Sequence, residues 1–224
     1  GWSRKDLAAR TGISERFLAE IETGVGNPSL LRLQTLARTF AVELVALLAT
    51  ARDQAPRHVT LLGLRGAGKS TVGPLLGKRL DLPFVELDAC VERASGLRIG
   101  EIFQVHGEAY YRATERAELQ RLLAAEPAVI AVGGGIVTDP QSFQALRTRS
   151  RSVWLQARPE DHWQRVLAQG DTRPMADNEQ AFADLRRILT QRDGLYRQAE
   201  IVVDTSKHSV AHVVDTLAKA LTRE

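Results

Sequence analysis

The chain has 224 residues, with 30 Lys and Arg against 27 Asp and Glu, so its formal charge of +3 does not by itself argue for nucleic acid. A single cysteine, Cys90, excludes an internal disulfide and fits a reducing cytosol. No uncharged apolar run reaches the length of a membrane span and no signal peptide is evident, so we expect a cytoplasmic protein without a membrane partner.

Residues 3–49 predict several short helices separated by tight turns. Ser3 and Ser14 are each placed to cap a helix, and Gly12 closes the first one. The predicted helices begin at residue 3, span 15–22, begin at residue 29 and span 42–48. Four apolar side chains of the third helix are expected to face inward: Leu31, Leu33, Leu36 and Ala37.

Two short helices joined by a turn containing glycine are typical of a helix-turn-helix, although a helical interaction module shows the same spacing. The stretch LAARTGISERFLAEIETGVGNPSLLRLQTLARTF has a Gly12-Ile13-Ser14 turn, an Ile21-Glu22-x-Gly24 exit and a Pro28-Ser29 helix start. It closely resembles the Cro/C1-type (Xre) DNA-binding domain. Most of that family's first helix is absent ahead of Trp2, and the chain opens with Gly rather than Met, so we expect some N-terminal sequence to be missing.

The resemblance implies that the second helix of the pair enters the major groove of double-stranded DNA and reads bases with its N-terminal residues. The matching candidates for DNA contact are Ser14, Glu15, Arg16 and Glu20, with Arg4 placed for a phosphate. Each of the charged ones can equally be a solvated surface charge. A domain this small usually needs a partner half-site, so we expect a homodimer on a pseudo-palindromic operator.

A polar segment broken by Pro56 predicts a linker, which gives expected domains at 1–50 and 58–224 with the linker at 51–57. From residue 58 strands and helices alternate, which predicts an α/β fold with a parallel sheet covered on both faces. Strands are expected at 58–62, 84–87, 128–132, 152–155 and 201–203. Helices are expected at 69–80, 88–94, 99–105, 108–125, 140–147, 159–168, 179–198 and 209–222.

The sequence GLRGAGKS follows the first of these strands directly and matches G-x-x-x-x-G-K-[ST], the phosphate-binding loop. Its backbone N–H groups and the following helix N-terminus suit a polyphosphate such as ATP, Lys69 reaches the outer phosphates, and the Ser70 hydroxyl suits Mg²⁺. The alternative is a glycine-rich turn that binds nothing. The expected nucleotide-binding residues are Gly63, Gly66, Ala67, Gly68, Lys69, Ser70 and Thr71.

Further candidate groups follow the other strands, where ligands of parallel sheets bind. Glu86 and Asp88 end the second strand, and Gly133, Gly134 and Gly135 end the third, where bare backbone allows a close approach. Three arginines suit a carboxylate or phosphate because guanidinium groups bind oxyanions bidentately. They are Arg112, Arg173 in the long polar loop 168–179, and Arg192.

Residues 58–222 look like shikimate kinase along the entire domain, through the motifs GLRGAGKST, FVELDACVE, GEAYYR, GGGIVTDP, TRPM and QRDGLYRQA. By position, the resemblance implies that Asp88, Arg112, Arg192 and the three glycines hold the substrate and that Asp88 orients the attacking hydroxyl. Lys69, Ser70 and Arg173 would steady the transferred phosphoryl group. Two positions depart from the pattern. Glu86 replaces an aspartate that helps hold Mg²⁺, and only Arg165 and Val166 lie near the adenine-stacking arginine's place.

The pairing of these two domains resembles the benzoyl-CoA-responsive repressors of aromatic-acid degradation, in which the kinase-like domain is an effector pocket. That resemblance implies a DNA-binding repressor with benzoyl-CoA as effector, its phosphates received by the loop and the arginines. An active shikimate kinase using ATP and Mg²⁺, with an accessory DNA-binding domain, is the alternative. A kinase for another small alcohol, such as gluconate, is a third reading.

Overall fold

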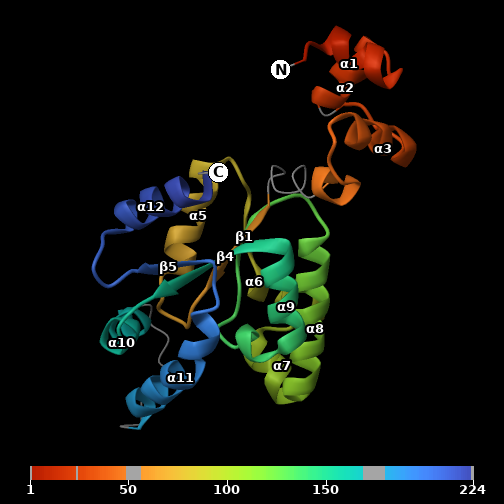
Figure 1. The fold of residues 1–224 in the computed structure, drawn as a ribbon. Coiled ribbons are helices and arrows are strands. Elements are labelled where there is room, and N and C mark those ends of the chain that lie inside the picture. Colours follow the sequence, from red (N-terminus) through yellow and green to blue (C-terminus); the bar gives the residue numbers. More distant parts are fainter. Residues whose placement is uncertain (1, 24, 49–56, 169–179, 223–224) are drawn as a thin grey trace. The chain divides into compact units, whose positions relative to one another are not determined.

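The structure is a computed structural model that describes residues 2–23, 25–48, 57–168 and 180–222 (Figure 1). The chain divides into two compact units, residues 1–56 and 57–224. None of the described helices is long and apolar enough to cross a membrane.

The N-terminal unit is built from short helices: α1 (Arg4–Thr11), α2 (Glu15–Glu22), α3 (Leu30–Thr39) and a helical segment at 44–48. Ser3 caps α1 by accepting a hydrogen bond from the Asp6 backbone N–H, and Ser14 caps α2 in the same way through Phe17. Gly12 ends α1 in the left-handed conformation, at φ 68°. These local signals produce the predicted helices because each cap satisfies backbone groups that a short helix leaves unpaired.

The core of this unit is small and centres on Ile13, Leu18 and Leu36. The prediction that Leu31 faces inward is wrong, since 74% of this residue is exposed. Leu31 precedes Leu36 by five positions, which turns it about 140° around the helix, away from the stripe that reaches the core.

The C-terminal unit is an α/β domain around a five-stranded sheet of order β2-β3-β1-β4-β5, in which every neighbouring pair is parallel. This confirms the predicted fold class. The strands are β1 (His58–Leu62), β2 (Phe84–Glu86), β3 (Val129–Ala131), β4 (Ser150–Gln156) and β5 (Ile201–Asp204). The central strand β1 is buried along its whole length, as expected for a strand covered on both faces.

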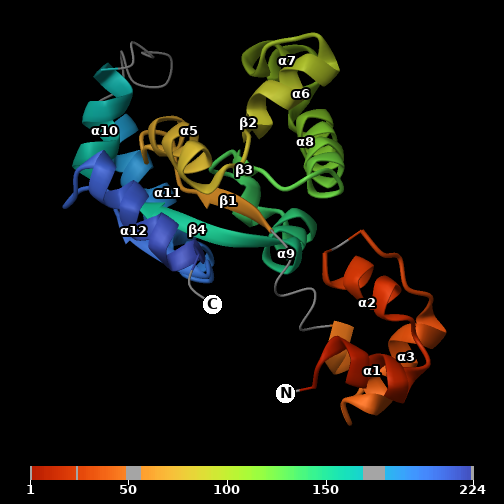
Figure 2. The same cartoon turned by 90° about the horizontal axis from the view of Figure 1, so that it is seen from above.

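Two apolar clusters flank the sheet. Val59 and Leu61 of β1 contribute to the cluster with α5 (Lys69–Leu80) and α12 (Val210–Thr222), whereas Leu62 contributes to the other. That second cluster takes side chains from α6 (Leu87–Ser95), α7 (Ile99–Val105), α8 (Gly107–Leu123), α9 (Pro140–Arg149) and α11 (Ala181–Tyr196). Both views show α6, α7 and α8 grouped together (Figure 2).

Two further elements follow strands of the sheet. α10 (Pro159–Ala168) follows β4, and the short 3₁₀ helix η1 (Ile136–Thr138), which the sequence pattern did not predict, follows β3. The segment 169–179 between α10 and α11 lies outside the described residues. The carboxyl ends of β1, β2 and β3 therefore bring the phosphate loop, the acidic residues and the glycine turn to one edge of the sheet.

Candidate functional site

The phosphate loop between β1 and α5 has a backbone that only glycine tolerates. Gly63, Gly66 and Gly68 have φ values of 140°, 77° and 101°. A Cβ on Gly66 would lie 2.6 Å from the His162 carbonyl oxygen, so no other residue fits without a backbone shift. The spacing of glycines in the sequence is thus a requirement of this turn, which points its N–H groups toward a common centre.

Hydrogen bonds from His162 and Arg165 of α10, which were not among the predicted site residues, support the loop backbone. The His162 ring Nδ1 lies 2.8 Å from the Arg65 carbonyl oxygen. Arg165 donates to the Gly66 carbonyl at 3.2 Å and to the Thr205 carbonyl at 2.8 Å. Arg165 therefore supports the loop backbone, and the neighbouring Val166 is almost fully buried, with 1% exposed.

Lys69 reaches back across the loop and donates to the carbonyl oxygens of Gly63 at 2.7 Å and Leu64 at 3.1 Å. Burial lowers the pKa of Lys69 to about 8, while the nearby carboxylates of Asp88 and Glu86 oppose that shift. A lysine so placed remains charged below pH 8 and sits where outer phosphates would meet the loop.

The acidic end of the site lies at β2. Asp88 is in the first turn of α6, immediately after the strand that ends at Glu86. Its Oδ1 is buried and has no hydrogen-bond partner among the described residues. Burial raises the pKa of Asp88, and the Glu115 carboxylate adds to the rise, whereas Lys69 counteracts it. A buried acceptor without a donor is costly, and a ligand hydroxyl would satisfy it.

The phosphate loop and the acidic strand are packed against each other through a glycine. A Cβ on Gly73 of α5 would lie 2.1 Å from the Phe84 ring of β2. The helix that follows the loop therefore sits directly on the strand that leads to Asp88.

The three glycines after β3 were expected to let a ligand approach the backbone closely. In the structure, the groups that lie close to them are side chains and backbone of this chain. At Gly134 a Cβ would lie 3.0 Å from the Leu64 Cα of the phosphate loop, and at Gly135 it would lie 2.7 Å from Arg112 Nη2. Arg192 and Tyr196 of α11 both donate to the Gly134 carbonyl oxygen, at 3.0 and 2.6 Å. The turn is thus the meeting point of the loop and two of the predicted arginines.

Burial raises the pKa of Tyr196 to about 12, although Arg192 opposes the rise, so the phenol stays a donor to the glycine turn across the physiological range. Tyr196 also stacks on Trp154 of β4, with ring centroids 5.5 Å apart. This residue, like Glu115, was not among the predicted site residues.

Glu115 is the buried anion of the site, with 1% exposed. Its Oε2 accepts from Arg112 Nη1 at 2.8 Å and its Oε1 accepts from the Tyr111 hydroxyl at 3.0 Å. Burial acts to lower the pKa of Arg112, but the hydrogen bond and charge of Glu115 outweigh it and raise that pKa. The sequence did contain a signal for Glu115. It lies three positions after Arg112, within ion-pairing reach on a helix, and four positions before Leu119 on the buried face of α8.

Ser70 and Glu86, the predicted metal ligands, lie at the start of α5 and the end of β2. Within the described ranges, no group of three or more His, Cys, Asp or Glu side chains is arranged to hold a metal ion. Magnesium usually takes one or two protein carboxylates together with waters and phosphate oxygens, so a hydroxyl and a carboxylate beside a phosphate loop fit it. The buried, unpartnered oxygen of Asp88 belongs to the same oxygen-rich edge. Arg173, the third predicted arginine, lies outside the described residues.

In the N-terminal unit three of the predicted DNA-contacting charges, Arg4, Arg16 and Glu20, already form ion pairs within the unit. Arg16 and Glu20 form an ion pair of 3.1 Å on α2, and Arg4 contacts Glu22 at 2.9 Å. Glu15 lies in the first turn of the same helix, and the Ser14 hydroxyl is engaged as its cap. Surface pairs of this kind are weak and are readily exchanged for other partners.

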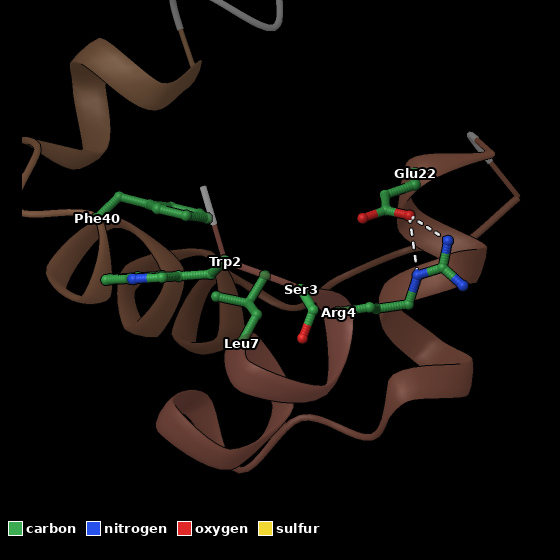
Figure 3. Close-up of a pocket in the computed structure, with 6 residues that line it drawn as sticks. All are labelled: Trp2, Ser3, Arg4, Leu7, Glu22 and Phe40. Atoms are coloured by element: carbon green, nitrogen blue, oxygen red, sulfur yellow. Dashed lines mark hydrogen bonds and ion pairs between the residues drawn. The ribbon is translucent and has the colours of Figure 1, made fainter.

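A pocket is lined on one side by the Arg4–Glu22 pair (Figure 3). Trp2 and Phe40 stack at one side of it, with ring centroids 5.9 Å apart, and Arg10 lies 4.2 Å from the centroid of the Trp2 ring. The lining residues are Trp2, Ser3, Arg4, Leu7, Glu22 and Phe40.

Comparison with known proteins identifies both units. A family profile described as shikimate kinase matches residues 65–222, and one described as helix-turn-helix matches residues 1–47. The chain is 39% identical to a shikimate kinase of Nitrobacter winogradskyi over 161 residues, 72% of this chain and 75% of that protein. It is 36% identical to the shikimate kinase of Zymomonas mobilis over 168 residues, 75% and 95% of the two chains.

A solved structure, shikimate kinase from Acinetobacter baumannii in complex with shikimate, is similar with a TM-score of 0.69 and 30% identity, over 75% of this chain and 94% of that one. Together with the parallel sheet and the phosphate loop, these matches show that the chain belongs to the shikimate kinase family and carries an N-terminal helix-turn-helix DNA-binding domain.

Proposed function

We propose that this protein is a DNA-binding transcriptional regulator, a repressor, whose shikimate kinase-type domain binds a small anionic effector. The observation that carries the proposal is the presence, in one chain, of a helix-turn-helix unit and a candidate ligand site that we call the ligand chamber. It consists of the phosphate loop, Asp88, the glycine turn 133–135, Arg112 and Arg192. Effector binding must favour one DNA-binding state over the other for the site to act as a switch. The unit that reads DNA is residues 1–50, joined by residues 51–57 to the effector domain.

Benzoyl-CoA is the proposed effector, on the strength of the family resemblance and of the chemistry of the site. Its diphosphate and 3′-phosphate are suited to a loop of converging N–H groups beside Lys69. Arg112 and Arg192, which meet at the glycine turn, offer further oxyanion contacts. Shikimate, with which a related protein forms a complex, is the competing ligand, and its carboxylate would suit the same arginines.

The test is fluorescence anisotropy of a labelled duplex from the DNA upstream of the protein's own gene, titrated with the full chain. We expect binding as a homodimer, and a change of at least tenfold in duplex affinity at saturating benzoyl-CoA. Shikimate, alone or with ATP and Mg²⁺, forms the second arm. The Arg16→Ala variant should lose duplex affinity, whereas Lys69→Ala should keep it and lose the response to benzoyl-CoA. Duplex affinity that stays constant with every ligand rules out the sensor.

A second candidate function, phosphoryl transfer, is favoured by the buried Asp88 oxygen, which has no donor among the described residues, and by the half-buried, cationic Lys69. In that reaction a ligand hydroxyl attacks the γ-phosphorus of ATP and the bond to ADP breaks. Asp88 accepts the hydroxyl proton, and because its pKa is raised by burial it is a stronger base than an exposed aspartate. Lys69 and Arg173 would stabilise the transferred group. Magnesium, held through Ser70 and Glu86, would neutralise phosphate charge.

ADP release in the presence of ATP, Mg²⁺ and shikimate, abolished by Lys69→Ala, would establish this activity. Release with gluconate but not shikimate would instead point to a kinase for another small alcohol. The pairing of Arg112 with Arg192 at one turn favours a substrate that carries a carboxylate.

A further inference from the structure

Tyr111 of α8 places a hydroxyl inside the ligand chamber. The residue is buried, with 6% exposed, and its hydroxyl donates to Glu115 Oε1 at 3.0 Å. The same hydroxyl oxygen lies 3.5 Å from the position that a Cβ on Gly133 would take, beside Asp88 Oδ1 at 3.4 Å. The hydroxyl therefore faces the glycine turn, while the ring belongs to the apolar core and packs against Phe103, with ring centroids 4.7 Å apart.

The Glu115 carboxylate is fixed by two donors, one at each oxygen. Tyr111 holds Oε1, and Arg112 Nη1 lies 2.8 Å from Oε2. With only one of them in place, a carboxylate can turn about its terminal torsion, which has a broad rotamer distribution. Its orientation in the chamber thus depends on the phenol as well as on the guanidinium.

Arg112 in turn has little freedom. Two of its guanidinium nitrogens lie 2.7 and 3.1 Å from the position that a Cβ on Gly135 would take, so the guanidinium fills the space that the glycine leaves open. Its other ion pair, with the exposed Glu108, is longer at 3.4 Å. The bond to Glu115 therefore sets where the guanidinium presents its free N–H groups.

We propose that Tyr111 is a positioning residue: its hydroxyl holds the Glu115 carboxylate so that Arg112 stays aimed at the glycine turn, ready to receive the oxyanion of a ligand. The inference rests on the proposed function in one respect, since it takes this chamber to bind an anionic ligand. Loss of the hydroxyl leaves a buried carboxylate oxygen without a donor and lets the carboxylate turn, which withdraws or tilts Arg112.

The experiment is calorimetric titration of shikimate and of benzoyl-CoA into the full chain, using whichever probe the wild-type protein binds. Tyr111→Phe is expected to weaken the affinity about tenfold, because a hydrogen bond to a charged group is lost. The matched control is Tyr110→Phe, which removes a hydroxyl from the adjacent, half-exposed ring and should change the affinity less than twofold. Thermal unfolding of both variants verifies that they are folded.

A double-mutant cycle with Glu115→Gln separates positioning from a general packing role. Because Tyr111 acts through the Glu115 charge, Tyr111→Phe should change the affinity less than twofold in the Glu115→Gln background. A second tenfold loss there, or an unchanged affinity of Tyr111→Phe in the wild-type background, overturns the inference while the ligand site stands. If the wild-type chain binds neither probe, the proposed effector site and this inference fail together.

Discussion

The candidate binding residues of the two units arrange charge in opposite ways. In the helix-turn-helix unit the Arg16–Glu20 and Arg4–Glu22 pairs are open to solvent, with side chains 38–90% exposed. In the kinase-type unit Glu115 is 2% exposed at its side chain and is matched by Arg112 at 2.8 Å. Exposed pairs can exchange partners when a phosphate backbone arrives, whereas a buried pair fixes a geometry and fails when one partner is removed.

We expect the largest difference between the two units in the stability lost when a glycine with a left-handed backbone is replaced by alanine. Gly66→Ala must move backbone, because its Cβ would lie 2.6 Å from the His162 carbonyl oxygen, whereas nothing lies within 4 Å of a Cβ on Gly12. We expect Gly66→Ala to destabilise its unit by about 3 kcal/mol or more and to abolish nucleotide binding, and Gly12→Ala to cost its unit about 1 kcal/mol. Hydrogen exchange followed by mass spectrometry reports each unit separately. Equal losses would show that crowding at Gly66 is relieved locally.

The next largest difference is expected in the free energy of unfolding when Arg112 or Arg16 is replaced by alanine. Arg112→Ala leaves the Glu115 carboxylate buried without its cation and should lower the unfolding free energy of the C-terminal unit by about 2–3 kcal/mol, with loss of shikimate or benzoyl-CoA binding. Arg16→Ala should change stability by less than about 0.5 kcal/mol and act on duplex affinity alone. Urea unfolding of each variant, with the anisotropy titration, tests both. A destabilised Arg16→Ala variant would contradict the view that its pair is expendable.

Several parts of this contrast were predictable from local sequence and others were not. The phosphate loop follows from a continuous motif between an apolar strand and a helix, and Asp88 and the glycine turn follow from their places after strands. Glu115 was missed because it meets Gly133 only when α8 packs beside the end of β3. The same holds for His162 and Thr205, which reach the loop from elements far along the chain.

Strand lengths illustrate the limit of periodicity. β4 begins at Ser150, two residues before its predicted start: Ser150 pairs with His58 of β1 in the sheet, and its hydroxyl accepts a buried hydrogen bond of 2.7 Å from Thr60. A polar residue satisfied by the neighbouring strand is compatible with a buried sheet, and a hydrophobic pattern does not report it.

A smaller effect is expected from pH. Lys69, with a pKa of about 8, is charged below that pH and loses its proton above it, so the affinity for ADP should fall about tenfold between pH 7 and pH 9. Lys69→Ala should bind ADP weakly with a flat profile. Titration calorimetry across this range provides the measurement, and a flat wild-type profile would show that Lys69 is not a phosphate contact.

The smallest effect is expected at the surface of the helix-turn-helix unit. Glu22 pairs with Arg4, which we propose contacts a DNA phosphate, so Glu22→Gln should free Arg4 and strengthen duplex binding about twofold to fivefold at low salt. The gain should shrink as salt rises, and Arg4→Ala should lower the salt slope by about one. Anisotropy titrations at several salt concentrations check both, and a gain that persists at high salt would indicate a different cause.

The contact between Gly73 and the Phe84 ring fixes the distance between the phosphate loop and Asp88 in the ligand chamber. Since the helix behind the phosphate loop and the strand ahead of Asp88 share this contact, the span between a bound phosphate and the acidic side chain is decided in the hydrophobic interior, before any ligand enters. A protein that evolved from a catalyst into a sensor, or the reverse, would keep this distance as long as it retained both Gly73 and Phe84. We therefore expect a change of ligand specificity at this site to arise from substitutions of the surrounding arginines and of Tyr111, while the Gly73–Phe84 contact is retained.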